Sequence, residues 1–160
     1  MQNLLDKDSV KRVQEFISEF DPKIKVIALN AAARTAREAA FFLKCEVGAI
    51  VKSLLFKVEE NFLICLIAGD KKCSLNKLKK ILNKKDICMA NPEEVRRITG
   101  FPIGGVSPVA HTRDIDILID SSLDRFKIIF AAAGHPNCIF KISYSDLIKI
   151  TNGFEKNISQ

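Results

Sequence analysis

The chain has 160 residues, of which 48% are hydrophobic and 28% are charged, a balance typical of one globular domain with a buried core. Its net charge of +6 permits an anionic partner such as nucleic acid but does not require one. The N-terminus lacks the apolar run of a signal peptide, and no window is long and apolar enough to span a membrane. The five cysteines are odd in number and lack CxxC spacing, which favours a reducing compartment. We therefore expect one cytoplasmic domain over residues 1–160.

The first half of the chain predicts two helices and a β-hairpin. A helix over 10–20 carries its apolar residues on one stripe, and Ser9 precedes it as a candidate N-cap. A second helix begins at Thr35, whose spacing to Glu38 fits a capping box. Strands are predicted over 23–29, 48–58 and 62–69, and three polar residues make a hairpin connection between the last two.

The second half alternates capped helices with apolar strands. Ser74, Asn91 and Ser143 are candidate N-caps of three helices. The first of these helices is rich in lysine and would turn Leu75, Leu78, Ile81 and Leu82 inward, and Gly153 would end the third. Further strands are predicted over 114–120, 127–133 and 138–143. Because hairpins alternate with helices, the sequence predicts a single α+β domain with a mixed, mainly antiparallel sheet flanked by helices.

Lys52 interrupts an apolar strand, where alternation places it on the same face as Ile50, Leu54 and Phe56. A buried ammonium is costly without a partner. One interpretation is a lysine that reaches water from a sheet edge along its aliphatic chain. The other is a lysine aimed into a pocket, at a phosphate, carboxylate or carbonyl oxygen. The local sequence leaves both open.

The segment Ile98–His111, ITGFPIGGVSPVAH, combines three glycines and two prolines with apolar residues. Gly104-Gly105 lets a ligand approach the backbone, and amides there can form an oxyanion hole or an anion nest. Alternatively, the loop is a tight connection that Ile103 and Val106 pack over the sheet. It is not a P-loop, since no GK[ST] follows, and not a dinucleotide-binding loop, since it precedes a strand.

The remaining polar candidates carry weaker signals. The two histidines, His111 and His135, lack zinc-site spacing, and we expect no metal and no cofactor. His135 lies in a Gly-His-Pro turn, where it faces either a site or solvent. Ser107 is not in the G-x-S-x-G context of a nucleophile elbow. Thr35 can cap its helix and also place its hydroxyl in a pocket.

Seven lysines lie within residues 70–85. Such a run is usually a solvated helix face. The functional alternative is a sequence-independent patch for a phosphate backbone. Few aromatic residues are interleaved, so stacking on bases is not favoured. The candidates for tRNA contact in this run are Lys71, Lys72, Lys77, Lys79 and Lys80.

Four stretches, in their order and spacing, resemble the family of YbaK and prolyl-tRNA-synthetase-associated editing domains. They are TAREAA, IVKSLLF followed by LIAGDKKCSLNKL, TGFPIGGVSPVAH, and AAAGHPNCIFKISYSDLIKITNG, and together they cover about 35–153. The resemblance implies a YbaK-like α+β domain with a twisted, partly barrel-like sheet. Ala110 departs from the family pattern, in which glycine is commoner at this position.

The resemblance implies an aminoacyl-tRNA deacylase that acts in trans on mischarged tRNA, often tRNA(Pro), with prolyl-tRNA synthetase or another synthetase as a possible partner. An aminoacyl ester is already activated, so a positioned water and a polarised carbonyl can suffice without a covalent nucleophile. We expect the pocket to admit a small wrong amino acid, Ala or Cys. The resemblance makes Lys52, Gly104 and Gly105 the catalytic candidates. The substrate-binding candidates are Thr35, Ser53, Phe101, Ile103, Val106, Ser107 and His135.

Two other functions remain open at this stage. One is a non-catalytic module that binds tRNA or a synthetase, against which Lys52 and Gly104-Gly105 argue. The other is a hydrolase of small esters without a tRNA partner, in which the lysine run is only a solvated face. Which amino acid and which tRNA are edited, and the oligomeric state, do not follow from the sequence.

Overall fold

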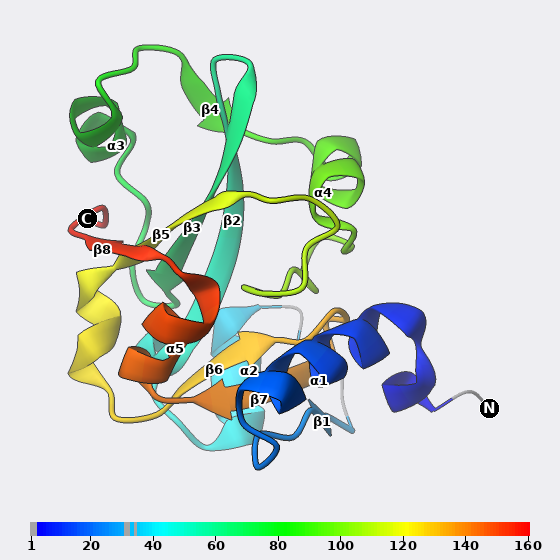
Figure 1. The fold of residues 1–160 in the computed structure, drawn as a ribbon. Coiled ribbons are helices and arrows are strands. Elements are labelled where there is room, and N and C mark those ends of the chain that lie inside the picture. The colour runs from blue at the N-terminus through cyan, green and yellow to red at the C-terminus, as the bar shows by residue number, and fades with distance from the viewer. Residues whose placement is uncertain (1–2, 31–32, 34) are drawn as a thin grey trace.

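The computed structural model describes residues 3–30, 33 and 35–160. It shows one mixed sheet with helices packed around it, as the sequence predicts (Figure 1). The α-helices are α1 (Asp8–Phe20), α2 (Ala36–Leu43), α3 (Leu75–Leu82), α4 (Pro92–Thr99) and α5 (Tyr144–Thr151). The strands are β1 (Ile27–Ala28), β2 (Ile50–Val58), β3 (Asn61–Ala68), β4 (Ile87–Met89), β5 (Asp116–Asp120), β6 (Ile129–Ala132), β7 (Cys138–Ile142) and β8 (Phe154–Lys156).

The strand order is β1-β7-β6-β2-β3-β5-β8, and β4 pairs with β2 outside this path. The pairs β1–β7, β6–β7, β2–β3 and β2–β4 are antiparallel, whereas β2–β6, β3–β5 and β5–β8 are parallel. Within β2, Ile50 and Val51 pair with β6, and residues 56–58 pair with β4. The edge of β2 between these two partners is therefore left unpaired.

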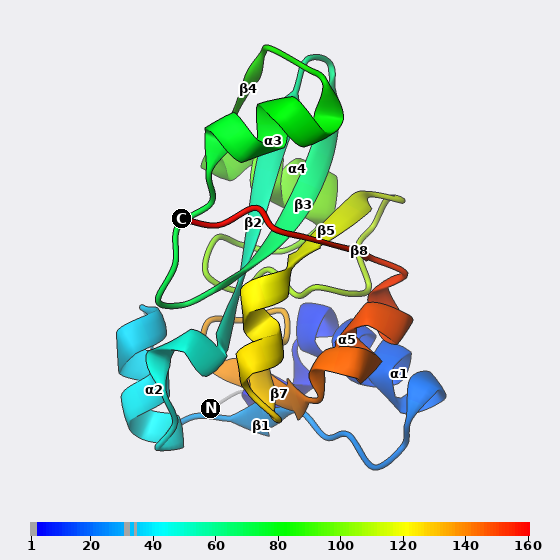
Figure 2. The same cartoon turned by 90° about the vertical axis from the view of Figure 1, so that its left-hand side faces the viewer.

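Helices cover both sides of the sheet where β6, β7 and β1 lie. Figures 1 and 2 show α1 and α5 on one side of these strands and α2 on the other. Helix α1 is anchored by Val10, Val13 and Ile17, which are at most 1% exposed. These side chains belong to the same apolar cluster as Phe101 and Val106, so α1 packs beneath the Gly- and Pro-rich loop.

Most predicted helix starts are confirmed. The side chains of Thr35, Ser74, Asn91 and Ser143 each accept a hydrogen bond from the backbone amide three residues later. The assignment of Ser9 as an N-cap is wrong. Helix α1 begins two residues earlier than expected, at Asp8, and the Ser9 hydroxyl instead donates to the carbonyl oxygen of Gly134 at 2.9 Å.

Several element boundaries and side-chain orientations differ from those that the sequence predicts. The strand expected over 23–29 shortens to β1, and α5 ends with Asn152, rather than Gly153, in the left-handed conformation. The short strands β4 and β8 were not predicted, because their pairing partners lie far away in sequence. Four side chains expected to face inward are exposed: Phe16, Phe20, Leu75 and Ile81.

Candidate functional site

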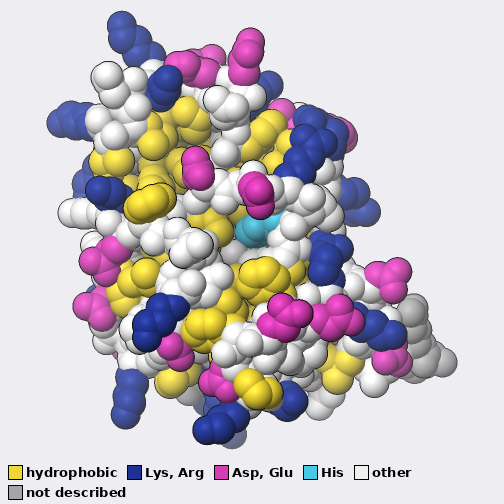
Figure 3. Space-filling view, in the orientation of Figure 1, with side chains coloured by type: hydrophobic (Ala, Val, Ile, Leu, Met, Phe, Trp, Pro, Cys, Tyr) yellow, Lys and Arg dark blue, Asp and Glu magenta, His cyan; other side chains and the backbone are white. Residues whose placement is uncertain are grey.

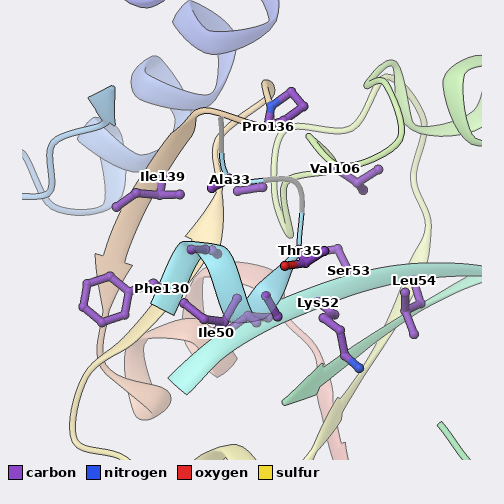
Figure 4. A pocket seen from close by; sticks show the side chains of 16 residues that line it. Ala33, Thr35, Ile50, Lys52, Ser53, Leu54, Val106, Phe130, Pro136 and Ile139 are labelled. Carbon is purple, nitrogen blue, oxygen red and sulfur yellow. The ribbon is translucent and has the colours of Figure 1, made fainter. Parts of the chain in front are cut away.

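A cavity of about 340 Å³ lies at the unpaired edge of β2, between the start of α2 and the loop that contains Gly104 (Figure 4). Its wall is mostly apolar and includes several small side chains. The lining residues are Ala33, Thr35, Ala36, Ala39, Ile50, Val51, Lys52, Ser53, Leu54, Gly104, Val106, Phe130, Ala131, Ala132, Pro136 and Ile139.

The unpaired strand edge brings backbone polar groups to this cavity. The Leu55 carbonyl accepts a hydrogen bond from the Ala90 amide at 3.0 Å, on the side of β2 away from β3. Because backbone groups alternate sides along a strand, the Ser53 N–H and C=O face this same edge. A ligand in the cavity can therefore meet backbone donors and acceptors as well as side chains.

Two hydroxyl groups stand in the cavity wall. Among the residues that the structure describes, Ser53 Oγ is the buried side-chain polar atom left without a hydrogen-bond partner. A buried polar atom in this state is costly, and native proteins usually satisfy such an atom with a protein group or a bound molecule. Thr35 Oγ accepts the Glu38 backbone N–H at 3.1 Å, so the helix cap fixes its position. The hydroxyl of Thr35 still has a proton to donate.

Lys52 also lines the cavity, and its ammonium is anchored at one side of it. Lys52 Nζ donates to the backbone carbonyl of Lys71. In Figure 4 its nitrogen points away from the end of the cavity lined by Pro136 and Ile139. Partial burial lowers the pKa of Lys52, while the nearby Asp70 carboxylate acts in the opposite direction. Lys52 is thus a partly desolvated cation at the border of the cavity, with its ammonium on the Lys71 carbonyl, and its role toward a ligand stays a prediction.

Gly104 and Gly105 occupy different environments. Gly104 lines the cavity and has φ of +85°, a conformation that favours glycine. The Gly105 amide donates to the Pro102 carbonyl at 3.0 Å, so it is engaged within the loop. A Cβ on Gly105 would lie 2.8 Å from His135 Cα, which shows that the loop packs directly on the backbone of the Gly-His-Pro turn.

Among the other loop candidates, Val106 lines the cavity, whereas Phe101, Ile103 and Ser107 do not. Phe101 is fully buried in the main apolar core. Ser107 is buried, and its hydroxyl accepts the Val109 amide. Ile103 is 55% exposed, so the expectation that it packs the loop on the sheet is wrong, whereas Val106 is buried as expected.

The Gly-His-Pro turn contributes Pro136 to the cavity, rather than His135. His135 Nδ1 accepts the Asn137 backbone N–H at 3.1 Å, which stabilises the turn. Partial burial lowers the pKa of His135, so the neutral ring that this contact requires is favoured. Of the seven substrate-binding candidates, the structure thus brings together Thr35, Ser53 and Val106.

Ala110 has φ of +64°, in the left-handed region that glycine adopts most easily. This geometry gives a physical reason why glycine suits the position.

The lysine-rich segment is partly tied down by other parts of the chain. Lys77 Nζ donates to Asn157 Oδ1 at 3.0 Å and to the Ser159 carbonyl, both in the C-terminal tail. Lys79 and Lys80 lie in the last turn of α3. In Figure 3, Lys and Arg side chains surround the visible face with acidic side chains among them, so this face carries no large patch of one charge.

Several lining residues were not anticipated from the sequence. They include Pro136, Ile139, Phe130 and a set of small residues: Ala33, Ala36, Ala39, Ala131 and Ala132. Alanine and isoleucine are ordinary core residues, and their sequence context carries no signal that distinguishes a cavity wall from a packed interior. The adjacent Gly-His-Pro turn was the one hint that this part of the chain borders a site.

Within residues 3–30, 33 and 35–160, no three His, Cys, Asp or Glu side chains gather where they could hold a metal ion. The helices in this part of the chain are all too short or too polar to cross a membrane.

The fold and the cavity define a small α+β domain that offers a mainly apolar pocket with two hydroxyls, one lysine and an open strand edge. Residues 30–150 match the family model of the aminoacyl-tRNA editing domain. The chain therefore belongs to the aminoacyl-tRNA editing domain family.

Individual relatives agree with this assignment. A proline–tRNA ligase of Kosmotoga olearia is 38% identical over 109 residues, which cover 65% of this chain but only 19% of the ligase. The protein YwhH of Bacillus subtilis, described as uncharacterized, is 30% identical over 87% of this chain and 88% of its own length. A crystal structure of a candidate trans-editing enzyme for prolyl tRNA synthetase superposes with a TM-score of 0.91 at 34% identity, covering 96% of this chain and 98% of the other.

Proposed function

We propose that this protein is a trans-editing deacylase that hydrolyses the ester of mischarged aminoacyl-tRNA, with tRNA(Pro) carrying a small wrong amino acid as its substrate. The observation that carries the proposal is the cavity at the open strand edge, which Lys52, Gly104 and Ser53 with its unpartnered hydroxyl all line. Similarity to a candidate trans-editing enzyme and to a segment of proline–tRNA ligases supports the choice of tRNA.

The wall of the cavity favours a small aminoacyl group. Five alanines from α2, the segment before it and β6 line it, and its polar groups are few. An apolar wall of this kind holds the side chain of alanine or cysteine without leaving polar groups unpaired.

The chemistry that these groups support is attack by water on the ester carbonyl. We assign the Gly104 amide to the developing oxyanion, because the Gly105 amide already binds Pro102. The hydroxyls of Ser53 and Thr35 would orient the aminoacyl group or the attacking water. The Lys52 ammonium has three donors, of which the Lys71 carbonyl takes one, so the others can bind a phosphate or the ester region.

Recognition of the tRNA body would rest on charge. Lys71, Lys72, Lys79 and Lys80 remain as candidates for this role, since Lys77 is tied to the C-terminal tail. Contacts of lysine with a phosphate backbone are independent of sequence. Selection of one tRNA would then require a synthetase partner, with prolyl-tRNA synthetase as the first candidate.

A substrate panel tests the proposal. The protein is incubated with Ala-, Cys-, Ser- and Pro-tRNA(Pro) and with the corresponding free aminoacyl esters. Hydrolysis of Ala- or Cys-tRNA(Pro), with Pro-tRNA(Pro) spared, is expected. Binding without turnover would instead indicate a non-catalytic module, and turnover of free esters alone would indicate a small-ester hydrolase.

The assignment of Lys52 has its own test. Lys52→Ala is expected to abolish deacylation while circular dichroism and unfolding show an intact fold. Lys141→Ala is a matched control, because Lys141 is also a strand lysine but is exposed on β7. Deacylation at the wild-type rate by folded Lys52→Ala would remove Lys52 from the mechanism.

A further inference from the structure

Helix α1 lies outside the residues matched by the editing-domain model, yet it contacts both loops that border the cavity. Arg12 Nε donates to the Ala110 carbonyl at 2.8 Å, and its Nη2 lies 3.4 Å from the Gly100 carbonyl. Its guanidinium carbon lies 4.5 Å from the centre of the Phe101 ring. One side chain thus bridges both ends of the loop that carries Gly104.

Ser9 makes the corresponding contact with the Gly-His-Pro turn. Its hydroxyl donates to the Gly134 carbonyl at 2.9 Å. Gly134 has φ of +90°, and a Cβ on it would lie 2.7 Å from the Ser9 carbonyl oxygen. The turn that supplies Pro136 to the cavity is therefore packed against the first turn of α1.

The two loops also contact each other. The Gly105 position packs on the His135 backbone, and the Gly104 position packs near Pro136. A displacement of either loop therefore moves the other. Helix α1 is a firm support for both, because Val10, Val13 and Ile17 are buried in the main core.

We propose that Arg12 and Ser9 are positioning residues, through which α1 fixes the two loops that form one wall of the cavity. The catalytic part of this inference rests on the proposed deacylase function. Arg12 and Ser9 do not line the cavity, so they act through Gly104 and Pro136 rather than by touching the substrate. Their removal should lower kcat, which depends on precise placement, more than it raises KM.

Steady-state deacylation by four variants tests this inference. Arg12→Ala is expected to lower kcat about tenfold with KM changed less than about threefold, because loop displacements below 1 Å misplace reacting groups. Arg12→Lys, which keeps the charge and one donor, should recover part of the loss, and Ser9→Ala should show a smaller loss. Lys11→Ala, an exposed neighbour on the same helix, should match the wild type.

A second measurement does not require activity. Burial lowers the pKa of His111, and the Arg12 charge lowers it further. Nuclear magnetic resonance of the two imidazoles should show the His111 pKa rising in Arg12→Ala but not in Lys11→Ala. The Gly104 amide resonance should also move only in the Arg12 variant.

The outcomes separate the two proposals. If the wild type hydrolyses no aminoacyl-tRNA, the proposed function fails, and the Gly104 resonance alone decides whether Arg12 holds the loop. If the wild type is active and folded Arg12→Ala keeps its kcat, the positioning role is overturned. If Arg12→Ala does not fold, kcat is measured for Arg12→Lys and Ser9→Ala instead. A wild-type kcat in both variants overturns the positioning role.

Discussion

Replacing Gly104 and Gly105 one at a time by alanine is expected to harm the protein for two different physical reasons. Gly104 has φ of +85°, and its new Cβ would lie 3.4 Å from Pro136 Cγ, an acceptable contact. The cost is therefore conformational, about 1–2 kcal/mol for alanine in the left-handed region. The added methyl group also reduces the conformational freedom of the unfolded chain, which stabilises the folded state by about 0.4–1 kcal/mol. We expect a net loss of about 1 kcal/mol of stability.

Gly105 has no positive φ, so its substitution isolates the steric effect. A Cβ there would lie 2.8 Å from His135 Cα, 2.9 Å from its N and 3.0 Å from its C. Nonbonded carbons prefer about 3.5–4.0 Å, so the two loops must separate by roughly 0.7 Å or more. Overpacking of this kind costs about 1–3 kcal/mol. Because the loops form one cavity wall, deacylation should fall by on the order of tenfold or more.

Urea unfolding and deacylation of both variants provide the measurement. Rates are compared at a temperature where each variant is fully folded, so that loss of stability does not contribute. Gly104→Ala is the comparison for the unfolding measurement alone, since it adds the same methyl group to the neighbouring residue without a close contact. A Gly105→Ala variant as stable and as active as the wild type would refute the close packing of the loop on His135.

Four further outcomes are expected. In urea unfolding, Ala110→Gly should change the free energy of unfolding by less than about 1 kcal/mol, because relief of left-handed strain is offset by the loss of a buried methyl group and by the greater freedom of the unfolded chain. Ala110→Val should destabilise the protein more, because valine is β-branched, and equal tolerance of both variants would contradict the positive φ. Ser53→Ala should unfold at the same or a higher urea concentration than the wild type, because the Ser53 hydroxyl is buried without a partner. The same variant should have a higher KM for deacylation, and an unchanged KM would place Ser53 outside substrate contact. Burial lowers the pKa of His111 in the folded state, so as pH falls the unfolded state binds this proton first. The difference in unfolding free energy between the wild type and His111→Asn should therefore be constant above about pH 6.5 and should turn against the wild type below it. A pH-independent difference would show that the pKa is not lowered. Charge reversal at Lys79 and Lys80 should weaken tRNA binding and flatten its dependence on salt in filter-binding assays, and an unchanged salt slope would exclude both lysines from the interface.

Local chemistry predicted a large part of the fold. Helix starts at Thr35, Ser74, Asn91 and Ser143 follow from side-chain oxygens that satisfy the first amides of a helix, an interaction within four residues. The β2–β3 hairpin follows in the same way, from alternation and a short polar connection. Ser9 shows the limit of this reasoning, because its hydroxyl binds Gly134, 125 positions away.

The sequence named some of the residues that line the cavity, among them the apolar Val106, and their roles stay predictions. Lys52, Ser53, Thr35 and Gly104 were all candidates from the sequence, and the structure places them around one cavity. The alanines that shape its wall carry no local signal, because a small apolar residue looks the same in a packed core and in a cavity wall. Gly105 was expected to offer its amide to a ligand, whereas the fold uses that position for contact with another loop.

The sequence by itself determined the α+β class, the family resemblance and most helix starts, and it named the polar residues that line the cavity, since these depend on patterns along the chain. Tertiary structure alone decided that β2 keeps an unpaired edge, that Lys52 anchors on the Lys71 carbonyl, and that α1 holds both loops through Arg12 and Ser9. These features join residues distant in sequence. The free energy that fixes them comes from packing and hydrogen bonds that exist only once the chain has folded.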